Sequence, residues 1–362
     1  MKRFVLLYMA CSCLLSGCIR NEEKVIHPED FAILQCNPPE MIVNEKSTAI
    51  TIGMIGDILL HYPLYTYDTY DIPFRSVKNQ LTGIDFLLAN QESLPGGAEY
   101  GLSGYPRFNS PKHIIRDLKA NGVDLLSIAN NHTMDLSEGG LLKAIHHMKE
   151  YGMPYIGAYE SAEDREEKRI FDVKGIQIGV LGYTYSLNGL GIPKGKGYLV
   201  SLIDRDKMET EIREMKKVAD IIVVSIHWGN EYALQPSEYQ RELADWLAAQ
   251  KVDIVFGHHP HVLQPYTEIG ETKIFYSLGN FYSAQQFDST NMGGIAEVEI
   301  SKVQFAGRSF TYVGDSSFYP TTVIRNENGR FVVVPLERGG AKYDAQWVEG
   351  HVGLSAGRED GK

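Results

Sequence analysis

Cysteine is scarce in this chain of 362 residues. Three of its four cysteines, Cys11, Cys13 and Cys18, lie within the first 18 residues, and Cys36 is the fourth. A single remaining thiol cannot form a disulfide within the chain. The stability of the folded part must therefore come from a hydrophobic core or from bound metal.

Basic residues are outnumbered as well. The chain has 35 Lys and Arg against 46 Asp and Glu, which gives a formal net charge of −11. Proteins that bind nucleic acid need clustered Lys and Arg to neutralise the phosphates. The charge balance therefore predicts that nucleic acid is not a partner, and that bound cations offset part of the acidity.

The N-terminus has an apolar run, Phe4 to Leu15, that is too short to cross a bilayer as a helix. The run ends in Leu15-Ser16-Gly17-Cys18, which resembles a bacterial lipobox, in which the cysteine is diacylated and becomes the first residue of the mature protein. A plain secretory signal or a chance Cys-rich leader is the alternative.

The lipobox predicts a signal peptide over residues 1–17, followed by the lipidated Cys18 and a polar tether over residues 18–47. We expect an extracytoplasmic protein that is anchored to the cell membrane through Cys18 and does not span it. Removal of Lys2 and Arg3 with the leader would lower the net charge from −11 to −13.

The rest of the chain is globular in composition, with 43% hydrophobic and 22% charged residues. Predicted strands cover 48–57, 84–90, 123–130, 170–185 (a hairpin), 220–226 and 252–257. One predicted helix begins at Ser110, two cover 139–151 and 204–218, and a fourth has a capping box of Ser237 and Gln240 and ends near Gln250. After about residue 273 only strands and turns follow. The pattern predicts an α/β domain over residues 48–345, antiparallel in its second half, and a flexible tail over 346–362.

Polar side chains stand where the buried strands end. They are Asp57 and His61; Asn90 and Glu92; Asn130, Asn131, His132 and Asp135; His227; and His258, His259 and His261. In open α/β sheets, ligands bind outside the carboxyl ends of the strands. These five strand ends therefore predict one composite site.

Carboxylate, amide and imidazole groups together suit Zn, Mn or Fe. One or two such ions could activate water, and a histidine free of metal could protonate a leaving group. Each motif also has a simpler explanation: Asp57 as a turn residue, Asn130-Asn131-His132 as an Asx turn with a helix cap, and His227 as a core histidine.

Six motifs resemble, in this order, the CapA family of bacterial capsule-synthesis proteins: 56-GDILLH-61, 90-NQES-93, 129-ANNHTMD-135, 227-HWGNEY-232, 257-GHHPHVLQP-265 and 276-YSLGNF-281. The family includes the membrane-associated component of poly-γ-glutamate synthesis complexes. It is in turn similar to calcineurin-like metallophosphoesterases. The resemblance implies an α/β sandwich of two packed mixed β-sheets flanked by helices, with a dinuclear metal centre.

The resemblance also implies roles for single residues. The implied metal ligands are Asp57, Glu92, Asn131, His227, His259 and His261. His132 would be the catalytic histidine, with Asp135 beside it. The implied substrate-binding residues are His61, Asn90, Arg107, Asn109, Asn130, Glu231, His258 and Asn280.

Two motifs depart from the phosphoesterase pattern. The first motif is usually Asp-x-His, but Leu59 stands at the second position after Asp57 and His61 follows two residues late. The second is usually Gly-Asp, where this chain has Gln91-Glu92. A site with one metal, or a site that binds without hydrolysing, therefore stays an alternative.

The function expected from the resemblance is in biosynthesis or export of capsule or poly-γ-glutamate, with metal-dependent hydrolysis of a phosphate ester or of an amide in an anionic polymer. The alternative is a non-catalytic lipoprotein that binds polymer or serves as a scaffold for polymer synthase or export proteins. A third reading, a carbohydrate- or peptide-binding lipoprotein, rests on the aromatic content of 10%.

Overall fold

The computed structural model describes residues 46–354, except residues 286, 306–307 and 340–342. The predicted signal peptide, Cys18 and nearly all of the predicted tether lie outside the described residues, as do residues 355–362. Among the described residues, no helix combines the length and the apolar character needed to cross a membrane.

Two mixed sheets form the centre of the described part. The strands of sheet one are β1 (Lys46–Leu59), β2 (Phe86–Gln91), β3 (Leu125–Ser127), β4 (Tyr155–Ile156), β11 (Asn280–Ser283), β12 (Met292–Phe305), β13 (Arg308–Arg325) and β14 (Phe331–Pro335). The strands of sheet two are β5 (Ile170–Val173), β6 (Ile176–Thr184), β7 (Ile221–His227), β8 (Ile254–His258), β9 (Leu263–Ile269) and β10 (Thr272–Leu278). Sheet one has the order β14-β13-β12-β1-β2-β3-β4, with β11 beside β1, and sheet two has the order β5-β6-β7-β8-β10-β9.

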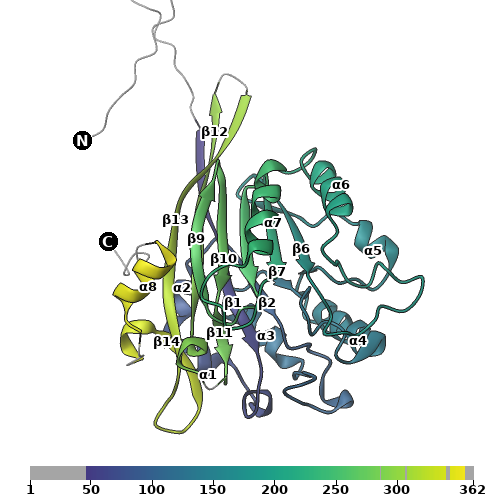
Figure 1. The fold of residues 1–362 in the computed structure, drawn as a ribbon, viewed down its shortest axis with the longest axis vertical. Coiled ribbons are helices and arrows are strands. Elements are labelled where there is room, and N and C mark those ends of the chain that lie inside the picture. The colour runs from purple at the N-terminus through teal and green to yellow at the C-terminus, as the bar shows by residue number, and fades with distance from the viewer. Residues whose placement is uncertain (1–45, 286, 306–307, 340–342, 355–362) are drawn as a thin grey trace, which may run out of the picture. The chain divides into compact units, whose positions relative to one another are not determined.

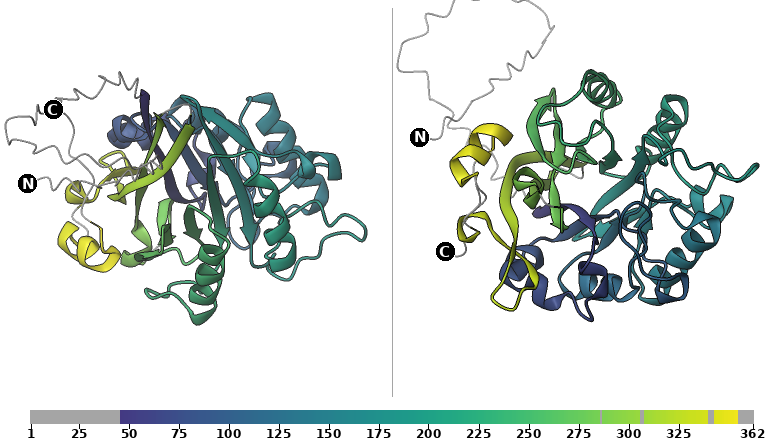
Figure 2. Two further views of the ribbon diagram at one scale, coloured as in Figure 1. Left: turned by 90° about the horizontal axis from the view of Figure 1, so that it is seen from above. Right: turned by 60° about the horizontal axis from the view of Figure 1, so that its bottom comes forward.

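Most helices lie on the outer faces of the two sheets, whereas α8 (Ala345–Val352) packs beside β9 (Figures 1 and 2). The helices are α1 (Asp71–Phe74), α2 (Lys78–Thr82), α3 (His113–Ala120), α4 (Ser137–Glu150), α5 (Ala162–Glu166), α6 (Arg205–Met215), α7 (Glu238–Ala249) and α8 (Ala345–Val352). Leu118 of α3 belongs to the apolar cluster on sheet one, Ile52 and Val223 to the cluster between the sheets, and Leu247 of α7 to the cluster on sheet two. The predicted sandwich of two mixed sheets flanked by helices is confirmed.

Most local predictions hold. The side chains of Ser237 and Gln240 form the predicted capping box of α7. The antiparallel pairing predicted after about residue 273 is confirmed for β12, β13 and β14. It is wrong for β10 and β11, which pair in parallel with β8 and β1. The predicted flexible tail is wrong for residues 346–352, which belong to α8. Val348 and Val352 of this helix are buried in the cluster between the sheets, so apolar burial holds it in place.

An aspartate stands just before each of four strands and binds the strand beside it. The carboxylates of Asp85, Asp124, Asp220 and Asp253 accept the backbone N–H groups of Thr51, Leu87, Gln177 and Ile222, at 2.7–3.2 Å. A backbone donor at the start of a ladder needs such a partner when it is removed from water. These aspartates lie at the amino ends of the strands, away from the ends where the predicted site residues stand.

Replacing Asp253 with asparagine should change how stability depends on pH. Burial raises the pKa of Asp253 to about 6, so as pH rises the unfolded chain releases this proton first and the folded state loses stability between about pH 4 and pH 6. The asparagine side chain does not titrate. We therefore compare the free energies of unfolding of the Asp253→Asn variant and the unchanged protein, measured in urea. The variant's value minus that of the unchanged protein should be about 2 kcal/mol larger at pH 7.5 than at pH 4.5.

Asp245, which is exposed on α7, supplies the matched Asp→Asn control. The difference in free energy of unfolding between variant and unchanged protein should change with pH for Asp253→Asn and not for Asp245→Asn. The same change in both would contradict the assignment to Asp253.

Candidate metal centre

Parallel pairing brings the predicted polar residues to one end of both sheets. Asp57 pairs with Asn90 of β2 and with Asn280 of β11, and His227 of β7 pairs with His258 of β8. Because parallel strands end at the same edge, the residues that follow them gather there too. Those residues are Glu92, Asn130, Asn131, His132, Asp135, His259 and His261, and each is at most 5% exposed.

A bulge at Gly56 directs Asp57 into this group. The register of β1 against β2 shifts between Ile55 and Asp57, and the Asp57 N–H binds the carbonyl oxygen of Gly279 at 2.9 Å. A Cβ on Gly56 would lie only 2.2 Å from that oxygen, so the position requires glycine. In the Gly-Asp pair, glycine is therefore required by the backbone and aspartate by the chemistry of the centre.

Asp57 is a buried carboxylate held by three side chains. Its Oδ1 lies 2.8 Å from Asn90 Nδ2 and 3.1 Å from His258 Nδ1, and its Oδ2 lies 3.3 Å from His261 Nδ1. Burial alone would raise the pKa of Asp57, but the bonds from the two histidines outweigh it and hold the pKa well below its usual range. Asp57 is therefore an anion.

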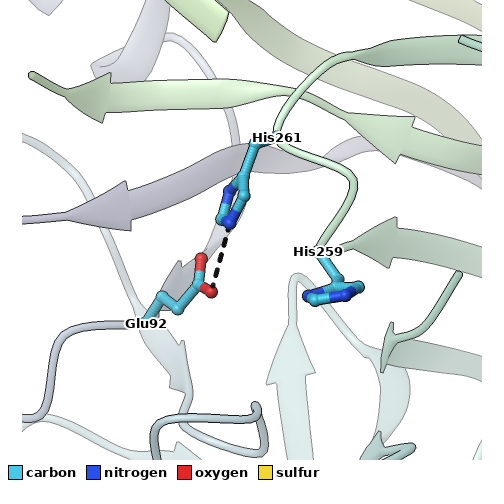
Figure 3. Close-up of side chains that lie close together, drawn as sticks. All are labelled: Glu92, His259 and His261. Atoms are coloured by element: carbon cyan, nitrogen blue, oxygen red, sulfur yellow. Dashed lines mark ion pairs between the residues drawn. The ribbon is translucent and has the colours of Figure 1, made fainter. Parts of the chain in front are cut away.

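Glu92 is the second buried carboxylate, and neither of its oxygens has a hydrogen-bond partner among the described residues. Its Oε1 lies 3.4 Å from His227 Nε2 and 3.8 Å from His261 Nε2. Burial raises the pKa of Glu92 to about 7. Figure 3 shows its carboxylate facing the His261 ring, with His259 across from both. Ligand atoms of Glu92, His259 and His261 lie within 4.8 Å of one another.

The turn after β8 holds His259 and His261 in backbone conformations that residues with a Cβ seldom adopt. Their φ angles are +96° and +58°, and such strain persists where the surrounding contacts fix it. The His259 N–H contributes one of these contacts, to Asp57 Oδ2 at 3.3 Å. The turn places both imidazoles next to Glu92.

His259 has one ring nitrogen bonded and one free. Its Nε2 lies 3.0 Å from the hydroxyl of Tyr185, whereas its buried Nδ1 has no partner among the described residues. Burial lowers the pKa of His259 to about 2, so the ring is neutral. A ring that donates an Nε2–H hydrogen bond to the Tyr185 hydroxyl presents a lone pair at Nδ1, which is the form that binds metal.

His261 carries the positive charge of the group. Burial would lower its pKa, but Glu92 and Asp57 outweigh burial and raise it to about 9. Its Nδ1 also lies 3.0 Å from Asn280 Oδ1. A protonated His261 balances the two carboxylates here, and a divalent cation would supply the same kind of compensation.

The donor set fits a divalent metal ion. Four side-chain atoms of this group are buried without a hydrogen-bond partner among the described residues: Asn90 Oδ1, both oxygens of Glu92, and His259 Nδ1. Buried polar atoms are nearly always paired in folded proteins, so their convergence indicates a ligand site. A mixture of carboxylate and amide oxygen with imidazole nitrogen suits Zn, Mn or Fe.

His132 and Asp135 form a hydrogen-bonded pair. His132 Nδ1 lies 2.7 Å from Asp135 Oδ2, and the same oxygen accepts the Phe108 N–H at 2.7 Å. The Phe108 ring meets the His132 ring edge to face, with centroids 4.7 Å apart. Asn130 Oδ1 accepts the His132 N–H at 3.0 Å, which is the Asx turn considered for this motif. These contacts fix the orientation of the His132 ring.

Asn131 is joined to the group through His227. Its Oδ1 lies 2.9 Å from His227 Nε2, and burial holds the pKa of His227 well below its ordinary value. A neutral imidazole and an amide oxygen side by side are both suitable metal ligands.

Five of the residues predicted to bind substrate make contacts within the protein or are exposed, and their binding role stays a prediction. His61 contacts Leu59 O at 3.2 Å and Ser283 Oγ at 3.3 Å. His258 contacts Asp57 Oδ1 through its Nδ1. The Asn109 amide donates to two carbonyl groups of the preceding loop, both at 2.8 Å. The remaining two, Arg107 and Glu231, are exposed. Asn109 therefore ties a loop together, and His258 supports a carboxylate.

Tyr185 and Phe108 are the contacts that the sequence prediction missed. Tyr185 directly follows β6, whose last residue, Thr184, pairs with His227. It therefore follows the same strand-end pattern as the histidines. The prediction missed it because only acidic, amide and histidine side chains were considered at the strand ends. Phe108 lies in a loop, and no pattern in the sequence indicates its position between His61 and His132.

A family model described as bacterial capsule synthesis protein PGA_cap matches residues 51–285. The chain belongs to the PGA_cap family. The match begins within β1 and includes every residue of the candidate metal centre, together with the His132–Asp135 pair. The predicted family is therefore confirmed.

Two curated relatives of this PGA_cap chain are capsule proteins. The PGA biosynthesis protein CapA of Bacillus subtilis (strain 168) is 35% identical over 230 residues, which cover 62% of this chain and 54% of that protein. The capsule biosynthesis protein CapA of Bacillus anthracis is 31% identical over 269 residues, which cover 71% of this chain and 64% of that protein. The chain thus spans between half and two thirds of the length of these relatives.

Solved structures with a similar chain course include the NAD nucleotidase NadN of Haemophilus influenzae, at 14% identity and a TM-score of 0.46, covering 81% of this chain and 61% of that chain. A 5'-nucleotidase precursor from Thermus thermophilus has 14% identity and a TM-score of 0.40, covering 74% of this chain and 54% of that chain.

Proposed function

We propose that this PGA_cap protein is a metal-dependent hydrolase, lipid-anchored outside the cytoplasmic membrane, that cleaves a phosphate ester or an amide during capsule polymer production. The observation that carries the proposal is that the buried, unpaired acceptor atoms of Glu92 and His259 lie together with His261. Such atoms are costly to bury unless a ligand satisfies them.

The ligands of one or two Mn, Zn or Fe ions would be Asp57, Glu92, Asn131, His227, His259 and His261. A bound ion of this kind supplies hydroxide near neutral pH and polarises the bond to be cleaved. The chain itself holds these ligands in place: Asn90 and His258 orient Asp57, and Tyr185 orients His259.

His132 is the residue proposed to move a proton. Asp135 occupies its Nδ1, so Nε2 is the nitrogen that would give a proton to the leaving group. A carboxylate that fixes the tautomer and the ring orientation of a histidine is a recurring arrangement for this role.

The proposed substrate is an anionic polymer or a phosphate ester, and the proposed partners are polymer synthase or export proteins. The names of the two Bacillus relatives support a role in capsule or PGA biosynthesis. The chain has a net charge of −11, so metal ions would have to offset repulsion of a polyanion.

A non-catalytic scaffold is the second candidate function. One observation favours it: His61, the histidine of the first motif, contacts Leu59 O and Ser283 Oγ and is not among the residues whose ligand atoms cluster. A phosphoesterase-like centre with one ligand fewer could bind a polymer without cleaving it.

Complementation of a deletion strain separates the two functions. If the protein is a hydrolase, a strain that produces the His132→Ala variant at normal level should make as little capsule polymer as the deletion strain. The exposed His146 of α4 gives the matched control, and His146→Ala should restore polymer. Polymer restored in full by His132→Ala would refute catalysis by His132 and favour the scaffold.

A further inference from the structure

The hairpin of β12 and β13 carries exposed aromatic side chains at its outer end. Phe305 is 47% exposed, Phe310 43% and Tyr312 56%. Side chains alternate along a strand, and Phe310 pairs with Val303, two residues before Phe305. All three rings therefore lie on one face of the hairpin. We call the described residues 301–305 and 308–312 the aromatic tip.

The aromatic tip has no negative charge in a strongly acidic chain. Between Ile300 and Val313 the sequence contains Lys302 and Arg308 but no Asp or Glu, whereas the whole chain has a net charge of −11. Lys302 contacts Asp220 at 2.6 Å, and Arg308 is exposed. The Lys302 charge is therefore paired, and Arg308 is the basic side chain beside the rings. Exposed aromatic rings beside a basic side chain are typical of surfaces at a membrane–water interface.

The chain enters the domain beside the aromatic tip. Lys46 of β1 pairs with Gln304, and Figure 1 shows the start of β1 next to the outer end of the hairpin. In the sequence, Lys46 follows Cys18 by 28 residues, and a segment of that length reaches at most about 95 Å when fully extended. An anchor at Cys18 would therefore hold the start of β1, and the aromatic tip beside it, within that distance of the bilayer.

The metal centre lies at the other end of the same strand. β1 runs from Lys46, beside the aromatic tip, to Asp57 and Leu59 in the metal centre. The strand from Lys46 to Asp57 is about 35 Å long at 3.3 Å per residue. Contact of the aromatic tip with a bilayer would therefore hold the metal centre away from the membrane surface.

We propose that the aromatic tip docks on the surface of an anionic lipid bilayer as a second membrane contact. Phe305, Phe310 and Tyr312 insert at the level of the headgroups, and Arg308 lies next to lipid phosphates. A lipid anchor holds a protein to the membrane, but a second contact is needed to fix its orientation. The inference rests on the proposed anchor at Cys18 for its geometry and not on hydrolysis. The aromatic tip lies outside the residues 51–285 that match the family.

The first test uses the full chain in vesicles of anionic lipid that contain brominated acyl chains. Tryptophan fluorescence of a Phe310→Trp variant should be quenched on incorporation. Tyr239 of α7, 45% exposed, is the matched control, because Tyr239→Trp should not be quenched. Equal quenching of the two reporters, or quenching of neither, would overturn the proposal.

The second test separates the aromatic tip from the anchor. A fragment of residues 19–362 lacks Cys18 and retains all three apolar clusters of the described part. It should sediment with phosphatidylglycerol vesicles, and Phe310→Glu/Tyr312→Glu should weaken this binding about tenfold or more. Tyr239→Glu should leave it unchanged. Failure of the fragment to bind, or equal binding by the double variant, would refute the aromatic tip even if Cys18 proves to be lipidated.

A second copy of the chain is the competing occupant. If the fragment forms a dimer without vesicles and the double variant is a monomer, by sedimentation, the aromatic tip is an interface between copies and the membrane proposal is wrong.

Discussion

Replacing His259 and His261 together with alanine should remove bound metal from this protein. The unchanged protein, purified without chelator, should carry one or two equivalents of Mn, Zn or Fe, and the double variant less than about a tenth of that. Even the loss of a supporting contact costs roughly 10–100-fold in metal affinity, and these residues supply two of the three ligand atoms that lie within 4.8 Å of one another. Elemental mass spectrometry measures the content directly.

Two further variants serve as controls for this measurement of metal content. His146→Ala removes an exposed histidine of α4 and should leave the metal content unchanged. Glu92→Gln keeps the volume of the buried side chain and should still lose metal, so it distinguishes a lost ligand from a damaged fold. Metal retained in the double variant and in Glu92→Gln would overturn the assignment of the centre.

Replacing His132 with alanine should lower turnover by about 10²–10⁴-fold, which is the usual contribution of a general acid or base. Metal content should stay unchanged, because His132 is not one of the proposed ligands and its Nδ1 is bound to Asp135. Asp135→Asn should cost less, since it removes only the partner at Nδ1 and leaves the imidazole in place. The assays would use a chromogenic phosphodiester and a γ-glutamyl amide.

The outcome divides the two functions. Normal turnover in His132→Ala would exclude the proposed role of this histidine. If the metal-loaded, unchanged protein cleaves neither substrate class, the scaffold is the better account, and the histidine-rich centre would then serve binding. Loss of metal from His132→Ala would show that the residue is a ligand and not a proton donor.

The strand-end rule predicted most of the candidate centre. Apolar runs that end in Asp57, Asn90, His227 and His258 are recognisable as buried strands, and parallel strands bring their ends to one edge. The pattern does not say which residue of a histidine cluster points where. His258 is the last residue of β8 and contacts Asp57 from behind, whereas His259 reaches the centre because its φ is +96°.

Contacts of loop residues could not be predicted from a period. The substrate role that the resemblance implies for Asn109 stays a prediction, whereas the structure shows its amide bound to backbone carbonyl groups 8 and 12 residues away along the chain. Phe108, its neighbour, instead packs against His132. A loop side chain is placed by whichever partner the fold brings near, and no residue period records that partner.

The sequence by itself determined the family, the alternation of strands and helices, and the group of strand ends that holds the chemistry. These follow from the period of apolar residues and from motifs that lie close together along the chain. Tertiary structure alone decided the finer geometry. The bulge at Gly56 needs the carbonyl of Gly279, and the aromatic tip faces the start of β1 through residues more than 250 positions away. Contacts between such distant segments depend on which strands pair in the sheet, and a local pattern carries no information about that pairing.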